Sequence, residues 1–221
     1  MTDRALVLDF GGVISRTMFE THPLTEKALG LAPGTLTWQG PFAPETDELW
    51  QRMQRDEITE RDYWTIRAKE TGQLVGKDWS KMSDFVVAAR AAHPMEIIRP
   101  EFLHTIETAK ANGVRLAILS NELDLFYGAD FKDKLSFMAD FECIVDATYT
   151  GILKPDPRAY QLIFDQMNIA PAHCVFVDDQ RRNIEGARKA GMNIVHFDVQ
   201  HPNKSYAEAL TKLGISAVQE A

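Results

Sequence analysis

The chain has 221 residues, of which 45% are hydrophobic and 25% are charged, as is typical of a folded protein with one large domain or with a core and an insert. Its formal net charge of −8 argues against a nucleic-acid partner, because a protein that binds phosphate backbones needs a basic face. No segment resembles a signal peptide and no apolar run is long enough to cross a bilayer, so we expect a cytoplasmic protein without a membrane partner.

The first apolar run, RALVLD at 4–9, is typical of a short buried strand. Asp9 ends this run, and Gly11 and Gly12 follow shortly before the apolar residues resume. Glycine at these two positions is compatible with a plain turn, or with a ligand that comes close to the backbone. Both interpretations are open at this point of the chain.

Residues 15–98 contain several helix-like segments and no convincing strand. Helices are predicted at 44–57, 59–72 and 79–93. Thr59 is the expected N-cap of the second of these helices, and Gly72 is its expected end. We therefore interpret 15–98 as a helical insert over a sheet and not as an independent domain.

From residue 99 onward, apolar runs of strand length alternate with predicted helices. Strands are expected at 114–120, 141–147, 173–179 and 192–197, and helices at 99–113, 156–168 and 180–191. The runs are nearly continuous in Val, Ile, Leu and Phe, which is typical of parallel strands buried on both faces. The alternation predicts a doubly wound, Rossmann-like α/β fold. Cys143 and Cys174 lie inside two of the runs and are interpreted as reduced core thiols.

Polar residues end several of the predicted strands. They are Asp9, Ser120, Asn121, Asp178, Asp179 and, in the loop after the third strand, Lys154. Because ligands bind at the carboxyl ends of the strands in an open α/β sheet, these residues are expected to converge on one edge. Three carboxylates with a lysine, a hydroxyl and glycine turns suit a hard cation such as Mg²⁺ together with an anion such as phosphate.

Each of these residues also has a simpler interpretation. A strand-end Asp often caps a helix or forms a turn, Ser120 and Asn121 can cap the next helix, and Lys154 can be an ordinary solvated lysine. The adjacent acids Asp178 and Asp179 are harder to explain, because they repel each other without a cation. Taken together, and in this order along the chain, the residues favour a functional site.

Four segments of the sequence resemble the motifs of the haloacid dehalogenase superfamily. They are LVLDFGGVI, AILSN, the Lys154 of ILKPDPRAY, and VFVDDQRRNIEGA. The resemblance extends from residue 4 to about residue 198, and the order and spacing of the motifs make it specific. It implies an α/β core domain at 1–14 and 99–221, with a helical cap domain at 15–98 inserted between the first and second core strands.

The resemblance also implies roles for individual residues. Asp9 matches the family's nucleophile, which forms an aspartyl-phosphate. Ser120 would hydrogen-bond the phosphoryl group with support from Asn121, and Lys154 would hold the nucleophile and the phosphate together. These matches imply a small phosphorylated molecule as the substrate.

The same resemblance implies a Mg²⁺ site beside the nucleophile. Asp9 and Asp179 would ligate the ion directly, and Asp178 would act directly or through water. The backbone carbonyl of Gly11 would be a further ligand. The turn formed by Gly11 and Gly12 would also bind the phosphate.

Gly11 departs from the usual phosphatase pattern, which has a second Asp at this position. That Asp protonates the leaving oxygen and then activates water, and its loss typically costs about 10²–10⁴-fold in rate. We favour a phosphatase of a small metabolite, for example a sugar phosphate, in which water, the substrate or a cap residue replaces this acid. A 2-haloacid dehalogenase, which needs no leaving-group proton, and a non-catalytic regulator that binds phosphate ligands are the alternatives. A phosphonate-cleaving relative would need a cap lysine, and 44–57 contains none.

The cap is expected to set the substrate, which the sequence does not identify. Trp38 and Phe42 either wall the substrate pocket or pack in the cap's own core. Arg181 and Arg182 either reach an anionic group of the substrate or lie on a solvated helix face. The sequence does not indicate the oligomeric state.

Overall fold

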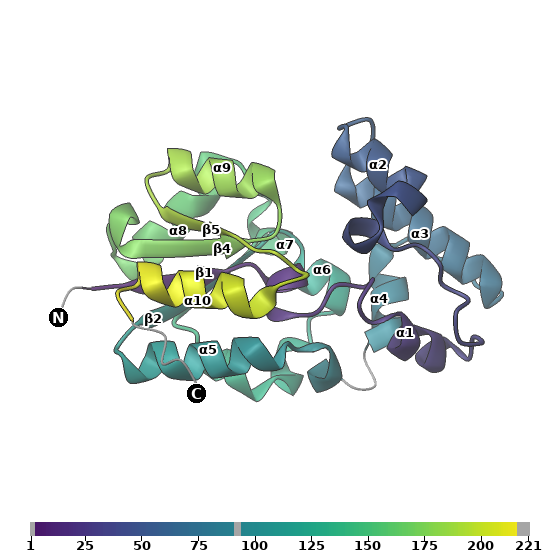
Figure 1. Ribbon diagram of the computed structural model, residues 1–221, viewed down its shortest axis with the longest axis horizontal. Helices are drawn as coiled ribbons and strands as arrows, with labels where there is room; N and C mark the ends of the chain where they lie inside the picture. Colours follow the sequence, from purple (N-terminus) through teal and green to yellow (C-terminus); the bar gives the residue numbers. More distant parts are fainter. Residues whose placement is uncertain (1–2, 91–93, 216–221) are drawn as a thin grey trace. The chain divides into compact units, whose positions relative to one another are not determined.

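Five strands form one parallel sheet. The computed structural model describes residues 3–90 and 94–215. The strands are β1 (Ala5–Leu8), β2 (Arg115–Ser120), β3 (Cys143–Asp146), β4 (Cys174–Asp178) and β5 (Asn193–His196). Their order in the sheet is β3-β2-β1-β4-β5 (Figure 1). Each strand lies within a predicted apolar run, and a helical insertion separates β1 from β2, so the predicted α/β fold is confirmed.

The central strand, β1, brings the polar strand ends together. It pairs in parallel with β2 and with β4, so that Leu8 lies opposite Ile118 on one side and Val177 on the other. In this register Asp9 follows the last residue of β1 at the same edge at which β2 and β4 end. The sheet therefore assembles side chains that are far apart in sequence.

Helices cover both faces of this sheet. They are α5 (Pro100–Ala111), α8 (Pro157–Met167), α9 (Arg181–Lys189) and α10 (Pro202–Lys212), with the short α6 (Leu123–Tyr127) and α7 (Ala147–Thr150) at the strand ends. Figure 1 shows α8 and α9 on one face, and α5 and α10 on the other. Val7 and Phe176 of the sheet belong to one buried cluster with Tyr160, Ile163 and Ile184 of α8 and α9. This packing fixes the strands whose ends carry the candidate site.

The chain divides into two compact units. The core unit contains Met1–Arg16, Ile98–Asp124 and Lys132–Ala221, and the insert unit contains Thr17–Ile97 and Leu125–Phe131. The sequence places the boundaries of the insert at 15–98 and does not single out the segment Leu125–Phe131. That this unit acts as a cap stays a prediction.

The insert unit has a hydrophobic core of its own. Its helices are α1 (His22–Leu29), α2 (Glu48–Gln54), α3 (Glu60–Leu74) and α4 (Met82–Arg90). Trp38 is 7% exposed and packs edge-on against Phe19, with a centroid distance of 5.4 Å. Phe42 is half-buried against the same cluster. Of the two interpretations of Trp38 and Phe42, packing within the insert is the one that the structure favours.

Two of the helices predicted in the insert are shorter than expected. The helix predicted at 44–57 is α2, which begins at Glu48 because the Asp47 side chain accepts the N–H of Trp50 at 2.9 Å and caps it. The helix predicted at 79–93 is α4, which begins only at Met82. Its predicted end at 91–93 lies outside the described residues.

The third predicted helix, α3, begins as expected and ends later. Thr59 caps it, and its hydroxyl and the Asp62 carboxylate form a reciprocal capping box. The helix passes Gly72, the predicted end, and continues to Leu74. A Cβ at Gly72 would lie 2.7 Å from the carbonyl oxygen of Lys77, so this glycine permits a close backbone approach and does not end the helix.

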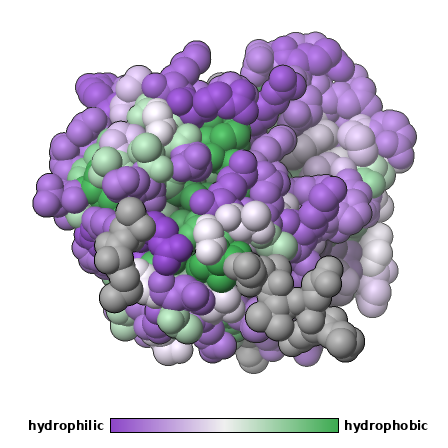
Figure 2. Space-filling model, turned by 60° about the vertical axis from the view of Figure 1, so that its left-hand side comes forward, coloured by the Kyte–Doolittle hydropathy of each residue, from purple (hydrophilic) through white to green (hydrophobic). Residues whose placement is uncertain are grey.

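None of the described helices is long and apolar enough to cross a bilayer. Figure 2 shows one face of the molecule, which is mostly hydrophilic with hydrophobic residues in small patches. The large hydrophobic side chains with the greatest exposure, 41% to 67%, are Leu74, Val87, Met95, Leu125, Tyr149 and Leu153. Scattered residues of this kind are ordinary on protein surfaces.

Candidate active site

The backbone after β1 turns tightly beside the candidate metal ligands. Asp9 still pairs with β4, because its N–H donates to the Val177 carbonyl at 3.0 Å. Gly12 has a φ of +76°, and a Cβ there would lie 2.7 Å from Oδ2 of Asp179. Glycine at position 12 is therefore required both by the backbone conformation and by the approach of a carboxylate.

Gly11 is different. Its φ of −68° is available to any residue, and a Cβ there would meet nothing within 4 Å. Glycine at position 11 is therefore not required by local packing. The structure leaves room at this position for a longer side chain.

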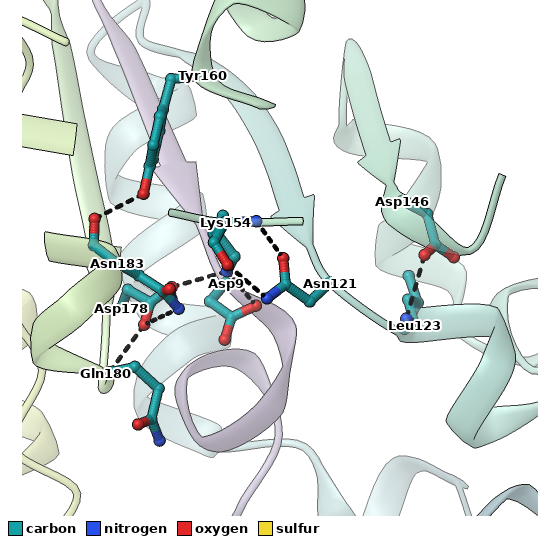
Figure 3. A network of polar contacts seen from close by, with 9 residues as sticks. All are labelled: Asp9, Asn121, Leu123, Asp146, Lys154, Tyr160, Asp178, Gln180 and Asn183. Carbon is teal, nitrogen blue, oxygen red and sulfur yellow. Dashed lines mark hydrogen bonds and ion pairs between the residues drawn. The ribbon is translucent and has the colours of Figure 1, made fainter. Parts of the chain in front are cut away.

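The ammonium group of Lys154 joins two carboxylates at the centre of the site. Its Nζ lies 2.9 Å from Oδ1 of Asp9 and 2.7 Å from Oδ2 of Asp178, and its side chain is 1% exposed (Figure 3). Burial lowers the pKa of Lys154, but the charges of Asp178 and Asp9 raise it by more, so the pKa ends above its ordinary value. Lys154 is thus a buried, permanently charged partner and not a solvated surface lysine.

Asp9 has a strongly perturbed pKa. Burial raises it most, Lys154 lowers it, and the charge of Asp178 raises it again, with the result that the pKa is raised to about 7. Without a metal, the Asp9 carboxylate is therefore partly protonated near neutral pH. A cation beside Asp9 would favour its ionised form.

Asp178 is held by a set of hydrogen bonds from its own loop and helix. It is fully buried, its Oδ1 accepts the N–H of Gln180 at 2.8 Å, and Nδ2 of Asn183 donates to its two oxygens at 3.1 and 3.0 Å (Figure 3). The hydroxyl of Tyr160 donates in turn to the Asn183 carbonyl at 2.7 Å. Asn183 and Tyr160 are not among the predicted site residues, although both lie inside the motifs that resemble the family. The signal for Asn183 was its place five residues after Asp178, on the first turn of α9.

Three carboxylates gather around one point. Asp9, Asp178 and Asp179 each offer an oxygen, and these atoms all lie within 4.8 Å of one another. An all-oxygen donor set of this kind suits Mg²⁺, which takes one or more carboxylates and completes its shell with water and substrate oxygens. The residues present therefore fit a Mg²⁺ ion.

Ser120 and Asn121 end β2 at the same edge. Oδ1 of Asn121 accepts the backbone N–H of Lys154 at 2.7 Å, and its Nδ2 donates to the Lys154 carbonyl at 3.2 Å. Ser120 is 6% exposed. The first N–H groups of the next helix, α6, donate to Asp146 and not to either residue, so the helix-cap interpretation of Ser120 and Asn121 is wrong.

Two other predicted residues lie outside this cluster. Arg181 and Arg182 are exposed in the first turn of α9. The other predicted site residues (Asp9, Gly11, Gly12, Ser120, Asn121, Lys154, Asp178 and Asp179) lie in the core unit, at the carboxyl edge of the sheet.

The profile of the haloacid dehalogenase-like hydrolases matches residues 4–191. The chain belongs to this family. It is 31% identical over 190 residues to (S)-2-haloacid dehalogenase 1 of Pseudomonas sp. strain CBS-3, which covers 82% of this chain and 83% of that protein. It is 30% identical over 99 residues to phosphatase MT3486 of Mycobacterium tuberculosis, covering 45% of this chain and 46% of the phosphatase. Relatives of this chain thus include both phosphatases and dehalogenases.

Some relatives are much longer than the region they share with this chain. Acyl-CoA dehydrogenase family member 10 of Mus musculus is 29% identical over 216 residues, which are 94% of this chain but 19% of the mouse protein. With several other curated relatives the chain shares about half of their length.

Solved structures show the same fold. A HAD-superfamily hydrolase of subfamily IA from Geobacter sulfurreducens has a TM-score of 0.56 at 17% identity, over 88% of this chain and 87% of that one. An Asp-to-Ala variant of a HAD family enzyme from Bacteroides thetaiotaomicron was solved with magnesium and inorganic phosphate. It has a TM-score of 0.51 at 17% identity, and the match covers 89% of this chain and 95% of that one.

Gly11 and Gly12 provide a matched test of the site geometry. Gly12→Ala should destabilise the fold by about 1–2 kcal/mol, because an alanine strains a positive φ, and it should weaken Mg²⁺ binding because its Cβ meets Asp179. Gly11→Ala has neither problem and should keep the wild-type unfolding free energy to within about 0.5 kcal/mol. Chemical denaturation and calorimetric Mg²⁺ titration of both variants measure these effects, and equal behaviour of the two would contradict the geometry.

Proposed function

We propose that this haloacid dehalogenase-like hydrolase is a Mg²⁺-dependent phosphatase of a small phosphorylated metabolite, for example a sugar phosphate. The observation that carries the proposal is the cluster of three carboxylates, Asp9, Asp178 and Asp179, two of which form ion pairs with Lys154. Dehalogenation of a 2-haloacid needs no cation, so three carboxylates gathered as a cation site would be superfluous in that reaction. The magnesium and phosphate in the Bacteroides structure support the same assignment.

Asp9 is the nucleophile in this proposal. One of its oxygens attacks phosphorus, a bond forms between them, and the bond from phosphorus to the leaving oxygen breaks. Water then attacks the aspartyl-phosphate, which releases inorganic phosphate and regenerates the carboxylate. Lys154, 2.9 Å from Oδ1, holds the nucleophile in place and offsets the charge that develops on the transferring group.

The surrounding residues bind the phosphoryl group and hold the site together. The hydroxyl of Ser120 donates to a phosphoryl oxygen, and the backbone at Gly11 and Gly12 approaches the same group. Mg²⁺, when bound by Asp9, Asp178, Asp179 and the Gly11 carbonyl, supplies positive charge that offsets the phosphate charge. Asn121 fixes the loop from which the ammonium group of Lys154 reaches Asp9.

Because position 11 is a glycine, it provides no general acid to protonate the leaving oxygen. The reaction should therefore depend steeply on the pKa of the leaving group, and solvent or the substrate would supply the proton. An activated ester such as p-nitrophenyl phosphate should be cleaved comparatively well. Alkyl phosphates should be cleaved more slowly.

Gly11→Asp tests this interpretation. Because a Cβ at position 11 meets nothing within 4 Å, the substitution meets no steric obstacle where the side chain begins. It should raise the rate on an alkyl phosphate by about 10-fold or more and leave the rate on p-nitrophenyl phosphate nearly unchanged. Gly11→Asn, which has the same size but cannot donate an acidic proton, is the matched control. Equal effects of the two variants on both substrates would count against a missing general acid.

A second candidate function is hydrolysis of a 2-haloacid. It is favoured by the 31% identity to (S)-2-haloacid dehalogenase 1 over most of both chains. It is also compatible with Gly11, because halide leaves without a proton. This reaction would proceed without Mg²⁺, and Gly11→Asp would bring no gain.

A further inference from the structure

One buried carboxylate at the end of β3 accepts hydrogen bonds from the N-termini of two helices. Asp146 is 4% exposed. Its Oδ2 accepts the N–H of Asp124 at 2.8 Å, and its Oδ1 accepts those of Thr148 at 2.9 Å and Leu123 at 3.3 Å. Leu123 and Asp124 begin α6, and Thr148 lies in α7. Figure 3 shows the bond from Leu123 in the same view as the active site.

The register of the sheet places this carboxylate next to the carboxyl end of β2. Asp146 pairs with Ser120 across β2 and β3, and Asn121 follows Ser120 directly. We infer that Asp146 is a positioning residue of the active site, which acts by holding the loop that carries Ser120 and Asn121. The catalytic consequence of this inference rests on the proposed function.

The short helices need such a residue. α6 has five residues and α7 has four, so neither is stable by itself, and their places depend on contacts at their ends. A buried carboxylate in turn requires several N–H donors to offset its lost hydration. All the hydrogen bonds described for Asp146 come from backbone N–H groups. The carboxylate and the three amide groups therefore fix one another.

The effect of Asp146 reaches the nucleophile through a short chain of contacts. Leu123 and Asp124 anchor the loop, and Asn121 within it binds both the N–H and the carbonyl of Lys154. The Nζ of Lys154 then lies 2.9 Å from Asp9. Release of the loop should loosen first Asn121 and then the backbone of Lys154.

A second contact ties the same two helices together more weakly. The hydroxyl of Tyr149 in α7 donates to Oδ2 of Asp124 in α6, and Nζ of Lys132 lies 2.9 Å from the same oxygen. Tyr149 is 67% exposed, so water can replace its bond. Tyr149→Phe should therefore have a smaller effect than a change at Asp146.

Hydrogen exchange tests the inference independently of any activity. In Asp146→Ala, the amide of Lys154, which donates to Asn121, should exchange faster together with those of Leu123, Asp124 and Thr148. Amides within β4 should keep their protection. Asp146→Asn keeps one acceptor oxygen and should be intermediate. An Ile106 variant in α5, chosen to lose the same unfolding free energy, should leave the Lys154 amide protected. Unchanged exchange at Lys154 in Asp146→Ala would overturn the inference.

Ligand binding then separates positioning from general structural damage. With Mg²⁺ saturating, Asp146→Ala should bind inorganic phosphate about tenfold more weakly, which is the effect of losing about one charge-assisted hydrogen bond. Its Mg²⁺ affinity should equal that of the wild type, because β1 and β4 carry the metal ligands. Equal losses of phosphate affinity in the Asp146 and Ile106 variants would refute a positioning role. If the wild type bound no phosphate, the proposed function would fail, and hydrogen exchange would still decide whether Asp146 holds this loop.

Discussion

Replacing Asp9 with asparagine is expected to lower the rate of phosphate release by about 10⁴-fold or more, the scale on which loss of a covalent nucleophile acts. The amide has nearly the same shape as the carboxylate, but it cannot attack phosphorus. It also replaces one of the three carboxylates of the metal site with a neutral amide, which binds a cation more weakly. Steady-state rates on p-nitrophenyl phosphate with saturating Mg²⁺ measure the loss.

The unfolding free energy of Asp9→Asn tests whether this loss of rate is chemical or a failure to fold. Burial raises the pKa of Asp9 to about 7, so the folded protein holds this proton more tightly than the unfolded chain does. Stability contributed by the group therefore falls as pH rises from about 4 to about 7. Without Mg²⁺ at pH 8, Asp9→Asn should unfold no more easily than the wild type. Asp198→Asn, at an exposed carboxylate bonded to His201, is the matched control and should keep the full rate.

Lys154→Met is expected to damage both stability and activity. The substitution keeps an unbranched side chain of similar length but leaves two buried carboxylates, Asp9 and Asp178, facing each other without the cation between them. Removing one partner of a buried ionic cluster typically costs about 3–5 kcal/mol of unfolding free energy. The rate should also fall by about 10²–10³-fold, because a preorganised positive charge at the reacting group is lost.

The loss of stability in Lys154→Met should depend on pH. Without Lys154 the charge of Asp178 raises the pKa of Asp9 further, and protonation of Asp9 relieves the repulsion. The variant should therefore be less destabilised at pH 5.5 than at pH 8, in denaturant titrations without Mg²⁺. Lys110→Met, which breaks a partly exposed ion pair with Asp140, should cost no more than about 1 kcal/mol. A similar, pH-independent loss in the two variants would contradict the assigned role of Lys154.

The strands and their polar ends could be predicted from the sequence for a clear physical reason. Strands buried on both faces of a parallel sheet are continuous apolar runs, and each run here ends where a polar residue begins. Asp9, Ser120 and Asp178 were accordingly located by a rule about strand ends. The pairing of Lys154 with both Asp9 and Asp178 required the fold, because the loop that carries this lysine has no periodic pattern.

Other features left weaker signals in the sequence. The helices α6 and α7 are too short for a hydrophobic period. The Asp146 carboxylate caps α7 from the adjacent position, but it binds the first N–H groups of α6 from a distance in sequence. In the sequence, Asp146 is an ordinary acid at the end of a strand. Its three N–H donors are evident only in the structure. The helix α10, by contrast, has Pro202 in its first turn and buries Tyr206, Ala209 and Leu210 at helical spacing. This pattern indicates a helix, although none was predicted there.

A paired assay for phosphate and halide release tests the central claim most directly. The purified protein is incubated with p-nitrophenyl phosphate and a panel of phosphorylated metabolites, and separately with a 2-haloacid, each with Mg²⁺ and with a chelator. The account predicts phosphate release that requires Mg²⁺ and that Asp9→Asn abolishes, with no halide release. Halide release that survives the chelator, without any release of phosphate, would contradict it.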